Sequence, residues 1–219
     1  MKEILNFLKD LSRNNNREWF QENKSRYEES HDKILVLTEI LNKELHKIDI
    51  DIPLMNARDC LFRIFRDVRF SNDKSPYKTH FGIYIVQGGR KSDKAGYYFH
   101  IEPGNSLVAG GIWRPQANIL KAARTEIYDC YDEFKEIINN AEFNKYFPLL
   151  EGEKLKTAPK DFEKDFPEID LLKYKSYTVS TPISEKTLIN EDAIQQMIKI
   201  CSIISRFNSF LNRGIEKWS

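Results

Sequence analysis

Arginines, histidines and a glutamate gather between residues 58 and 102 of this chain. Six basic and three acidic side chains lie between residues 58 and 78, a local excess of three positive charges, whereas the whole protein has a net charge of +1. Arginine binds phosphate or carboxylate groups in a bidentate, charge-assisted geometry that lysine does not match. Histidines beside a carboxylate can transfer protons near neutral pH. These residue types predict a site for a small anionic ligand.

Alternation of side chains indicates how the candidates are positioned. Residues 61–70, 81–86 and 97–102 alternate as strands do, and neighbouring strands of one antiparallel sheet would place their polar side chains on one face. Arg63, Asp67 and Arg69 join that face if the first strand is in a compatible register. The acid–base candidates are His80, His100 and Glu102. The ligand-binding candidates are Arg63, Arg66, Asp67, Arg69, Lys74, Tyr77, Lys78, Tyr84 and Tyr98.

Several interpretations of these residues remain open. Asp67 can neutralise Arg66 and Arg69 in a purely structural network, with the function elsewhere. A metal ion would find ligands in His80, His100, Glu102 and Asp67, but they lack the compact HxH or HExxH spacing, and no metal site is predicted. Binding of nucleic acid or an acidic protein by residues 90–94 with Lys74 and Lys78 is an alternative that the near-zero net charge does not favour. Whether the chain is an enzyme or a sensor stays open, and no cofactor or oligomeric state is indicated.

The surrounding elements follow from hydrophobic spacing. Helical periodicity predicts helices over residues 4–11 and 17–47, after Pro115 to residue 138, and from Asn190 towards the C-terminus. Short connections join strands at residues 61–70, 81–86, 97–102 and 106–113, with one more strand at 175–181. We expect an α+β fold with an antiparallel meander sheet of four to five strands and long helices packed on one face.

Bulk composition places the chain among ordinary globular proteins. Its 219 residues, 41% hydrophobic and 31% charged, suit one domain over residues 1–219. The three cysteines are scattered and form no CxxC pair, which predicts a reducing cytoplasm instead of disulfides or structural zinc. Neither a signal peptide nor a membrane span is predicted, because no apolar run is long enough.

One long motif resembles a known family. The run RIFRDVRFSNDKSPYKTHFG has an RxxRDxRFxxDKxxY pattern and resembles the signature of the DUF2461 family of bacterial proteins. The blocks NNNREWFQENKSRYE, YYFHIEPGNSLVAGGIWRP, KSYTVSTPIS and FNSFLNR are similar to that family's other blocks. The resemblance implies a single domain over nearly the whole chain. It assigns no catalytic residue, because the family is uncharacterised.

Overall fold

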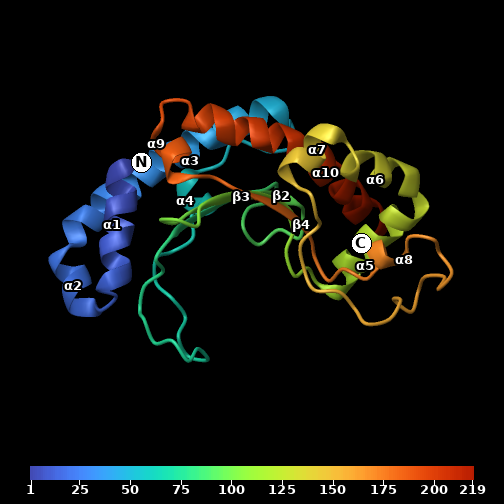
Figure 1. The fold of residues 1–219 in the computed structure, drawn as a ribbon, viewed down its shortest axis with the longest axis horizontal. Coiled ribbons are helices and arrows are strands. Elements are labelled where there is room, and N and C mark those ends of the chain that lie inside the picture. The colour runs from blue at the N-terminus through green and yellow to red at the C-terminus, as the bar shows by residue number, and fades with distance from the viewer. The chain divides into compact units, whose positions relative to one another are not determined.

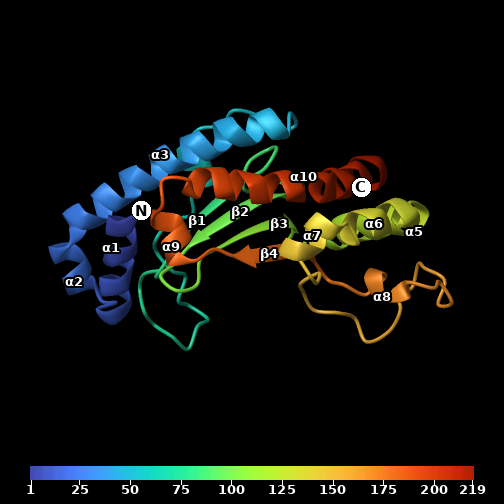
Figure 2. The same ribbon diagram turned by 45° about the horizontal axis from the view of Figure 1, so that its top comes forward.

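A four-stranded sheet organises the structure, a computed structural model that describes residues 1–219. The strands follow one another in the order β1-β2-β3-β4 as an antiparallel meander. Figure 1 shows the ribbon, and in Figure 2 the four strands can be followed in this order. The predicted α+β fold with a meander sheet is therefore confirmed. The strands are β1 (Phe81–Ile85), β2 (Gly96–Ile101), β3 (Leu107–Ile112) and β4 (Tyr177–Pro182).

The chain divides into two compact units, and each contains part of the sheet. Unit 1 comprises Met1–Ile85, Tyr98–Val108 and Pro182–Ile198. Unit 2 comprises Val86–Tyr97, Ala109–Thr181 and Lys199–Ser219. The single domain over residues 1–219 stays a prediction. None of the helices combines the length and the apolar character that crossing a bilayer requires.

Unit 1 contains the N-terminal helices, and α3 packs on α1, α2, α4 and β1. The helix predicted over residues 17–47 is two helices, because the chain breaks at Asn23, whose side-chain amide donates to the carbonyl of Trp19. Asn16 caps α2 by accepting from the backbone N–H of Trp19. The helices are α1 (Lys2–Arg13), α2 (Arg17–Glu22), α3 (Lys24–Ile48), α4 (Ala57–Cys60) and α9 (Glu185–Ile189).

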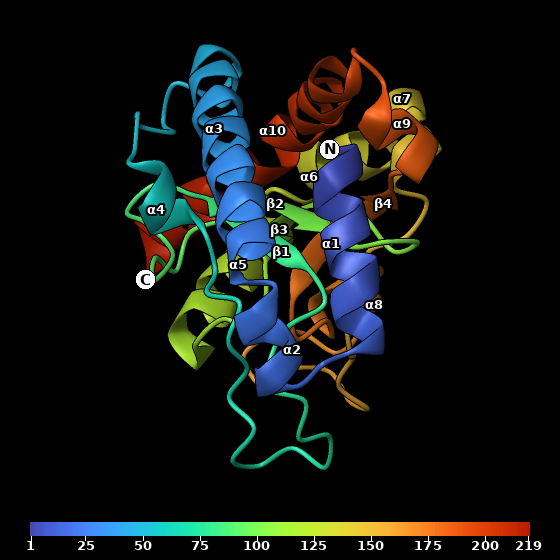
Figure 3. The same ribbon diagram turned by 90° about the vertical axis from the view of Figure 1, so that its left-hand side faces the viewer.

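The predicted strand over residues 61–70 is wrong. Residues 61–78 instead form an irregular hairpin, here called the arginine hairpin, with a single antiparallel bridge between Phe65 and Tyr77. Leu61 at its start forms another single bridge, to Ile83 in β1. Beyond Arg66 the side chains of Asp67 and Asp73 bond to backbone N–H groups two residues later, which ends the ladder. The tip of the hairpin extends away from the helices of unit 1 (Figure 3).

Unit 2 is built around α10 (Ala193–Trp218), whose residues 199–218 belong to it. Aromatic side chains of α10 and α6 form its core, with Phe134 lying 5.1 Å from Phe210 between ring centroids. Asn208 and Asn212 on α10 donate to the backbone carbonyls of Gly96 and Ala95 and so fix the start of β2. The other helices are α5 (Ala117–Asp129), α6 (Tyr131–Ile138), α7 (Ala141–Tyr146) and α8 (Ile169–Leu172). The long helix predicted after Pro115 therefore breaks between α5 and α6.

Alternate residues of β1 and β2 divide between a buried and a polar face. Phe81, Ile83, Phe99 and Ile101 are almost completely buried. The intervening residues of unit 1 are the polar ones, as the alternation predicts. This polar face carries the candidate site.

Candidate functional site

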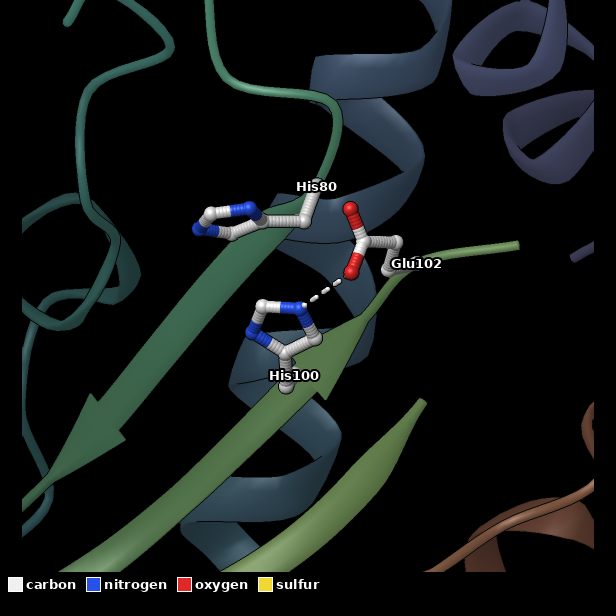
Figure 4. Close-up of side chains that lie close together, drawn as sticks. All are labelled: His80, His100 and Glu102. Atoms are coloured by element: carbon white, nitrogen blue, oxygen red, sulfur yellow. Dashed lines mark hydrogen bonds and ion pairs between the residues drawn. The ribbon is translucent and has the colours of Figure 1, made fainter. Parts of the chain in front are cut away.

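Two histidines and a glutamate from different parts of the chain meet on the polar face of unit 1 (Figure 4). His80 directly precedes β1, His100 lies in β2 and Glu102 follows β2. The imidazole centroids of His80 and His100 are 4.2 Å apart. Nε2 of His100 lies 3.1 Å from Oε2 of Glu102. The antiparallel register thus brings together the three acid–base candidates, called here the His–His–Glu cluster.

Glu102 is fixed by the turn that joins β2 to β3. The hydroxyl of Thr79 donates to Oε1 at 2.7 Å, and the side-chain amide of Asn105 donates to Oε2 at 3.0 Å. The hydroxyl of Ser106 donates to the carbonyl of Glu102 and accepts from its backbone N–H. Burial alone raises the pKa of Glu102, but the hydrogen bonds from Thr79, Asn105 and His100 outweigh it, and the net pKa is below its usual value. Glu102 is therefore a preorganised carboxylate at neutral pH.

Tyr98 holds the opposite side of the His100 ring. Its hydroxyl oxygen lies 3.0 Å from Nδ1 of His100. Burial raises the pKa of Tyr98 to about 12, so the phenol stays protonated. Gly82 on β1 leaves the space that this phenol occupies, because a Cβ there would lie 2.9 Å from the Tyr98 oxygen. The missing side chain at Gly82 and the phenol of Tyr98 together set the position of His100.

His80 is half-buried and neutral at physiological pH. Burial lowers the pKa of His80 to about 4, and the positive charges of His100 and Lys78 act in the same direction, while Glu102 opposes them. Lys78 also stands over the ring of Phe62, with Nζ 5.4 Å from the centroid. His80 can therefore offer a lone pair or an N–H group without carrying charge.

Carboxylates within the arginine hairpin pair with its arginines. Arg69 makes two hydrogen bonds to the carboxylate of Asp67, at 3.0 and 2.7 Å, and these lower the pKa of Asp67 to about 2. Arg66 pairs with Asp73. Arg63 is exposed and forms no ion pair among the residues of the chain. Two of the three arginines thus already have a protein carboxylate as partner.

The remaining ligand-binding candidates have structural contacts. Tyr77 is buried and stacks on Phe20 with centroids 3.9 Å apart. Lys74 donates from Nζ to the carbonyl of Val68 at 3.0 Å within the hairpin tip. Tyr84 is half-buried, and burial raises its pKa to about 12. Lys94, which the nucleic-acid alternative uses, pairs with Glu216 in unit 2.

The donor atoms of the His–His–Glu cluster also suit a cation. One ligand atom each from His80, His100 and Glu102 lies within 4.8 Å of the other two. Asp67, the fourth candidate metal ligand, is held by Arg69 in the hairpin instead. The prediction of no metal site depended on spacing along the sequence, whereas pairing of strands determines which ligands meet. The cluster can thus act in proton transfer or in ligation.

Several residues that support the site were not singled out from the sequence. Thr79, Asn105 and Ser106 are of types too common in turns and strand ends to stand out, whereas Gly82 had a signal, because glycine is uncommon inside strands. Asn105 had one signal, its place in a Pro-Gly-Asn run, a composition typical of turns, three residues after Glu102. Asn15 had none: its side chain donates to the carbonyl of Tyr77 and accepts from its N–H, which ties the linker between α1 and α2 to the arginine hairpin.

Comparisons with known proteins agree with the resemblance of the central motif. The searches of curated proteins and of solved structures give no match. The family model described as "Conserved hypothetical protein (DUF2461)" matches residues 3–210, which include the arginine hairpin and the His–His–Glu cluster. The match covers nearly the whole chain, so this protein is a member of the DUF2461 family.

Proposed function

We propose that this chain binds a small anionic ligand, bearing phosphate or carboxylate, at the His–His–Glu cluster, and acts on it as an enzyme or senses it. One observation carries the proposal. The arginine hairpin returns to the sheet at His80, and the ring of His80 faces that of His100 at 4.2 Å. A segment with a local excess of three positive charges therefore ends beside the two histidines of the cluster.

Arg63 is the arginine that we assign to the ligand. Arg66 and Arg69 would have to exchange Asp73 and Asp67 for the ligand, whereas the guanidinium of Arg63 forms no ion pair. A free guanidinium offers a planar fork to one phosphate or carboxylate group. Lys78, whose charge acts on His80, adds a second positive charge at the base of the hairpin.

Isothermal titration with inorganic phosphate and with malonate tests the proposal. We expect saturable binding of one of them to the wild-type chain, and at least roughly tenfold weaker binding by Arg63→Ala, since a charge-assisted hydrogen bond contributes about 1.5–3 kcal/mol. Arg69→Ala is the matched control and should bind as the wild type does. No binding of either anion by the metal-free or the metal-loaded chain, or equal loss in both variants, would contradict the proposal.

The hairpin tip favours a second candidate function, binding of single-stranded nucleic acid. Phe70 is 96% exposed, and the guanidinium carbon of Arg69 lies 5.8 Å from its ring centroid. An exposed aromatic ring beside arginine can stack on a base. Fluorescence anisotropy with a labelled oligonucleotide tests this: binding should weaken steeply with salt and be lost in Phe70→Ala. Binding that does not depend on salt or on Phe70 would contradict it.

A further inference from the structure

We propose that His80, His100 and Glu102 ligate one divalent transition-metal ion, and that this ion gives the site its affinity for an anion. The inference deepens the proposed function. Its second part, the role of the ion in binding the anion, rests on that function, whereas the ion site depends on the geometry of the cluster alone. The types of ligand atom limit which metal ions can bind. Two imidazole nitrogens and one carboxylate oxygen suit zinc, iron, manganese or nickel, whereas calcium and magnesium prefer oxygen ligands throughout.

The positions of the donor atoms are close to those of a bound site. Ligand atoms of a tetrahedral zinc ion lie roughly 3.4 Å apart, given bonds of about 2.0 to 2.2 Å. Nε2 of His100 and Oε2 of Glu102 are already 3.1 Å apart, and all three donor atoms lie within 4.8 Å of one another. Binding of an ion would require the side chain of His80, which directly precedes β1, to move closer to the other two ligands.

Each of the two closer ligands has a hydrogen-bond partner behind it. Tyr98 occupies Nδ1 of His100, so that Nε2 is the nitrogen that faces Glu102. Thr79 donates to the other carboxylate oxygen of Glu102. Metal-binding histidines and carboxylates are oriented by such outer partners, which fix the tautomer and the ring plane. A carboxylate and an imidazole that formed only a hydrogen bond to each other would not need these two outer partners, Tyr98 and Thr79.

Charge explains why an ion is required for the proposed ligand. Imidazoles that ligate a metal ion are neutral, so the three ligands together contribute a charge of −1, from Glu102. A divalent cation changes that charge to +1. Three protein ligands also leave a coordination position open, as in catalytic zinc sites, and an anion or a water molecule can take it. The side chains of His100 and Glu102 are 14% and 22% exposed, so both are in contact with solvent.

Zinc titration of the full-length chain tests the site. The chain, without an affinity tag, is stripped with a chelator and titrated with Zn²⁺ by calorimetry, and bound metal is counted by mass spectrometry. We expect one zinc per chain, with affinity reduced more than about 100-fold in His80→Gln and Glu102→Gln, and about tenfold in Tyr98→Phe, whose effect is indirect. Replacement by Co²⁺ should give a visible d–d spectrum that Glu102→Gln changes. Circular dichroism verifies that each variant is folded.

Two further variants test whether histidine or cysteine side chains outside the cluster bind the zinc. His46→Gln removes a histidine whose Nδ1 is bonded to the carbonyl of Ile52, and Cys130→Ser removes the cysteine that is not fully buried. Both should bind zinc as the wild type does. Absence of zinc from the wild-type chain at micromolar concentration, or full zinc binding by a folded His80→Gln/His100→Gln double variant, would overturn the inference.

Phosphate titration of stripped and zinc-loaded chain separates this inference from the proposed function. Binding of phosphate to the zinc-loaded chain only is the expected result. Equal phosphate binding by both forms would overturn the role of the ion but would still support the proposed anion site. Zinc binding without phosphate binding in either form would support the ion site and contradict the proposed function.

Discussion

The hydroxyl oxygen of Tyr98 lies 3.0 Å from Nδ1 of His100, in the space left open by Gly82. Tyr98 and His100 are two residues apart on β2, so their side chains leave the strand on the same face. The phenol orients the imidazole so that its second nitrogen points to Glu102. A strand that must provide this contact cannot have a larger residue opposite Tyr98, which explains the glycine on β1.

Gly82→Ala tests that explanation. Its Cβ would lie 2.9 Å from the Tyr98 oxygen and 3.2 Å from Phe62, so the phenol must move, and the hydrogen bond to His100 lengthens. The moving atom is the far end of a side chain, so stability should change by less than about 1 kcal/mol. Phosphate affinity should fall roughly tenfold, the effect typical of removing an outer partner. Calorimetry and urea unfolding measure the two quantities; unchanged phosphate affinity would show that the Tyr98 contact has no functional role.

Replacement of Asn15 tests how much its contact with the arginine hairpin contributes to stability. Asn15→Ala removes both hydrogen bonds to the backbone of Tyr77, and the half-buried peptide groups lose their partners. We expect a loss of about 2 kcal/mol in urea unfolding. Asn15→Asp should lose less, because it keeps the acceptor for the Tyr77 N–H. The exposed neighbour variant Asn14→Ala should be close to the wild type, and an equal loss there would remove the special role of Asn15.

Gly111 and Gly89 provide a matched pair in unit 2. Both have positive φ, 103° and 79°, but a Cβ on Gly111 would overlap the carbonyl oxygen of Tyr177 on β4, whereas nothing lies within 4 Å of one on Gly89. Gly89→Ala should cost about 1 kcal/mol from backbone strain alone. Gly111→Ala should cost roughly 4 kcal/mol or more, because two strands must separate. Thermal unfolding measures both, and similar costs would contradict the described packing of β3 on β4.

Glu126 gives a prediction about acid stability. Its side chain is 1% exposed, and Oε1 accepts from Arg213 at 2.6 Å while Oε2 accepts from Trp218 at 3.0 Å. Burial raises the pKa of Glu126, but the hydrogen bonds from Trp218 and Arg213 outweigh it, so the folded pKa lies below the unfolded one. The folded chain therefore binds fewer protons, and its stability falls as the pH drops below the unfolded value of about 4.3.

Glu126→Gln should accordingly be less stable than the wild type by about 2 kcal/mol at pH 7, where a charge-assisted bond is lost. The difference should shrink as the pH falls towards 3, because the wild-type carboxylate then becomes protonated. Urea midpoints at pH 7, 5, 4 and 3 measure this. A difference between the two proteins that stays constant over this range would contradict the linkage to Glu126.

The sequence predicts the part of the fold that depends on periodicity. Alternation in residues 81–86 and 97–102 identified β1 and β2 and placed His80 and His100 on one face, where their rings lie 4.2 Å apart. The same alternation failed in residues 61–70, because Asp67 and Asp73 bond to local backbone N–H groups and a periodic pattern does not show that competition. The breaks at Asn23 and Cys130 were missed for a related reason: the apolar spacing continues across both.

The sequence predicted which residues form the site better than it predicted which of them pair with one another. Residues 80, 100 and 102 were selected as proton carriers, and the register of the sheet determines that they meet. Partners for Arg66 and Arg69 depended on the path of the hairpin tip, which no periodicity fixes. The contact of Asn15 with Tyr77 spans 62 positions of the chain, so it is visible only in three dimensions.

The histidine ring signals in NMR test the central claim most directly, because the chain has four histidines and only two belong to the cluster. Inorganic phosphate is added to the zinc-loaded, ¹⁵N-labelled full-length chain, and the signals are assigned with His→Gln variants. Saturable shifts of the His80 and His100 signals, with those of His31 and His46 unchanged, are the predicted result. Unchanged His80 and His100 signals, or equal shifts of all four, would contradict an anion site at the His–His–Glu cluster.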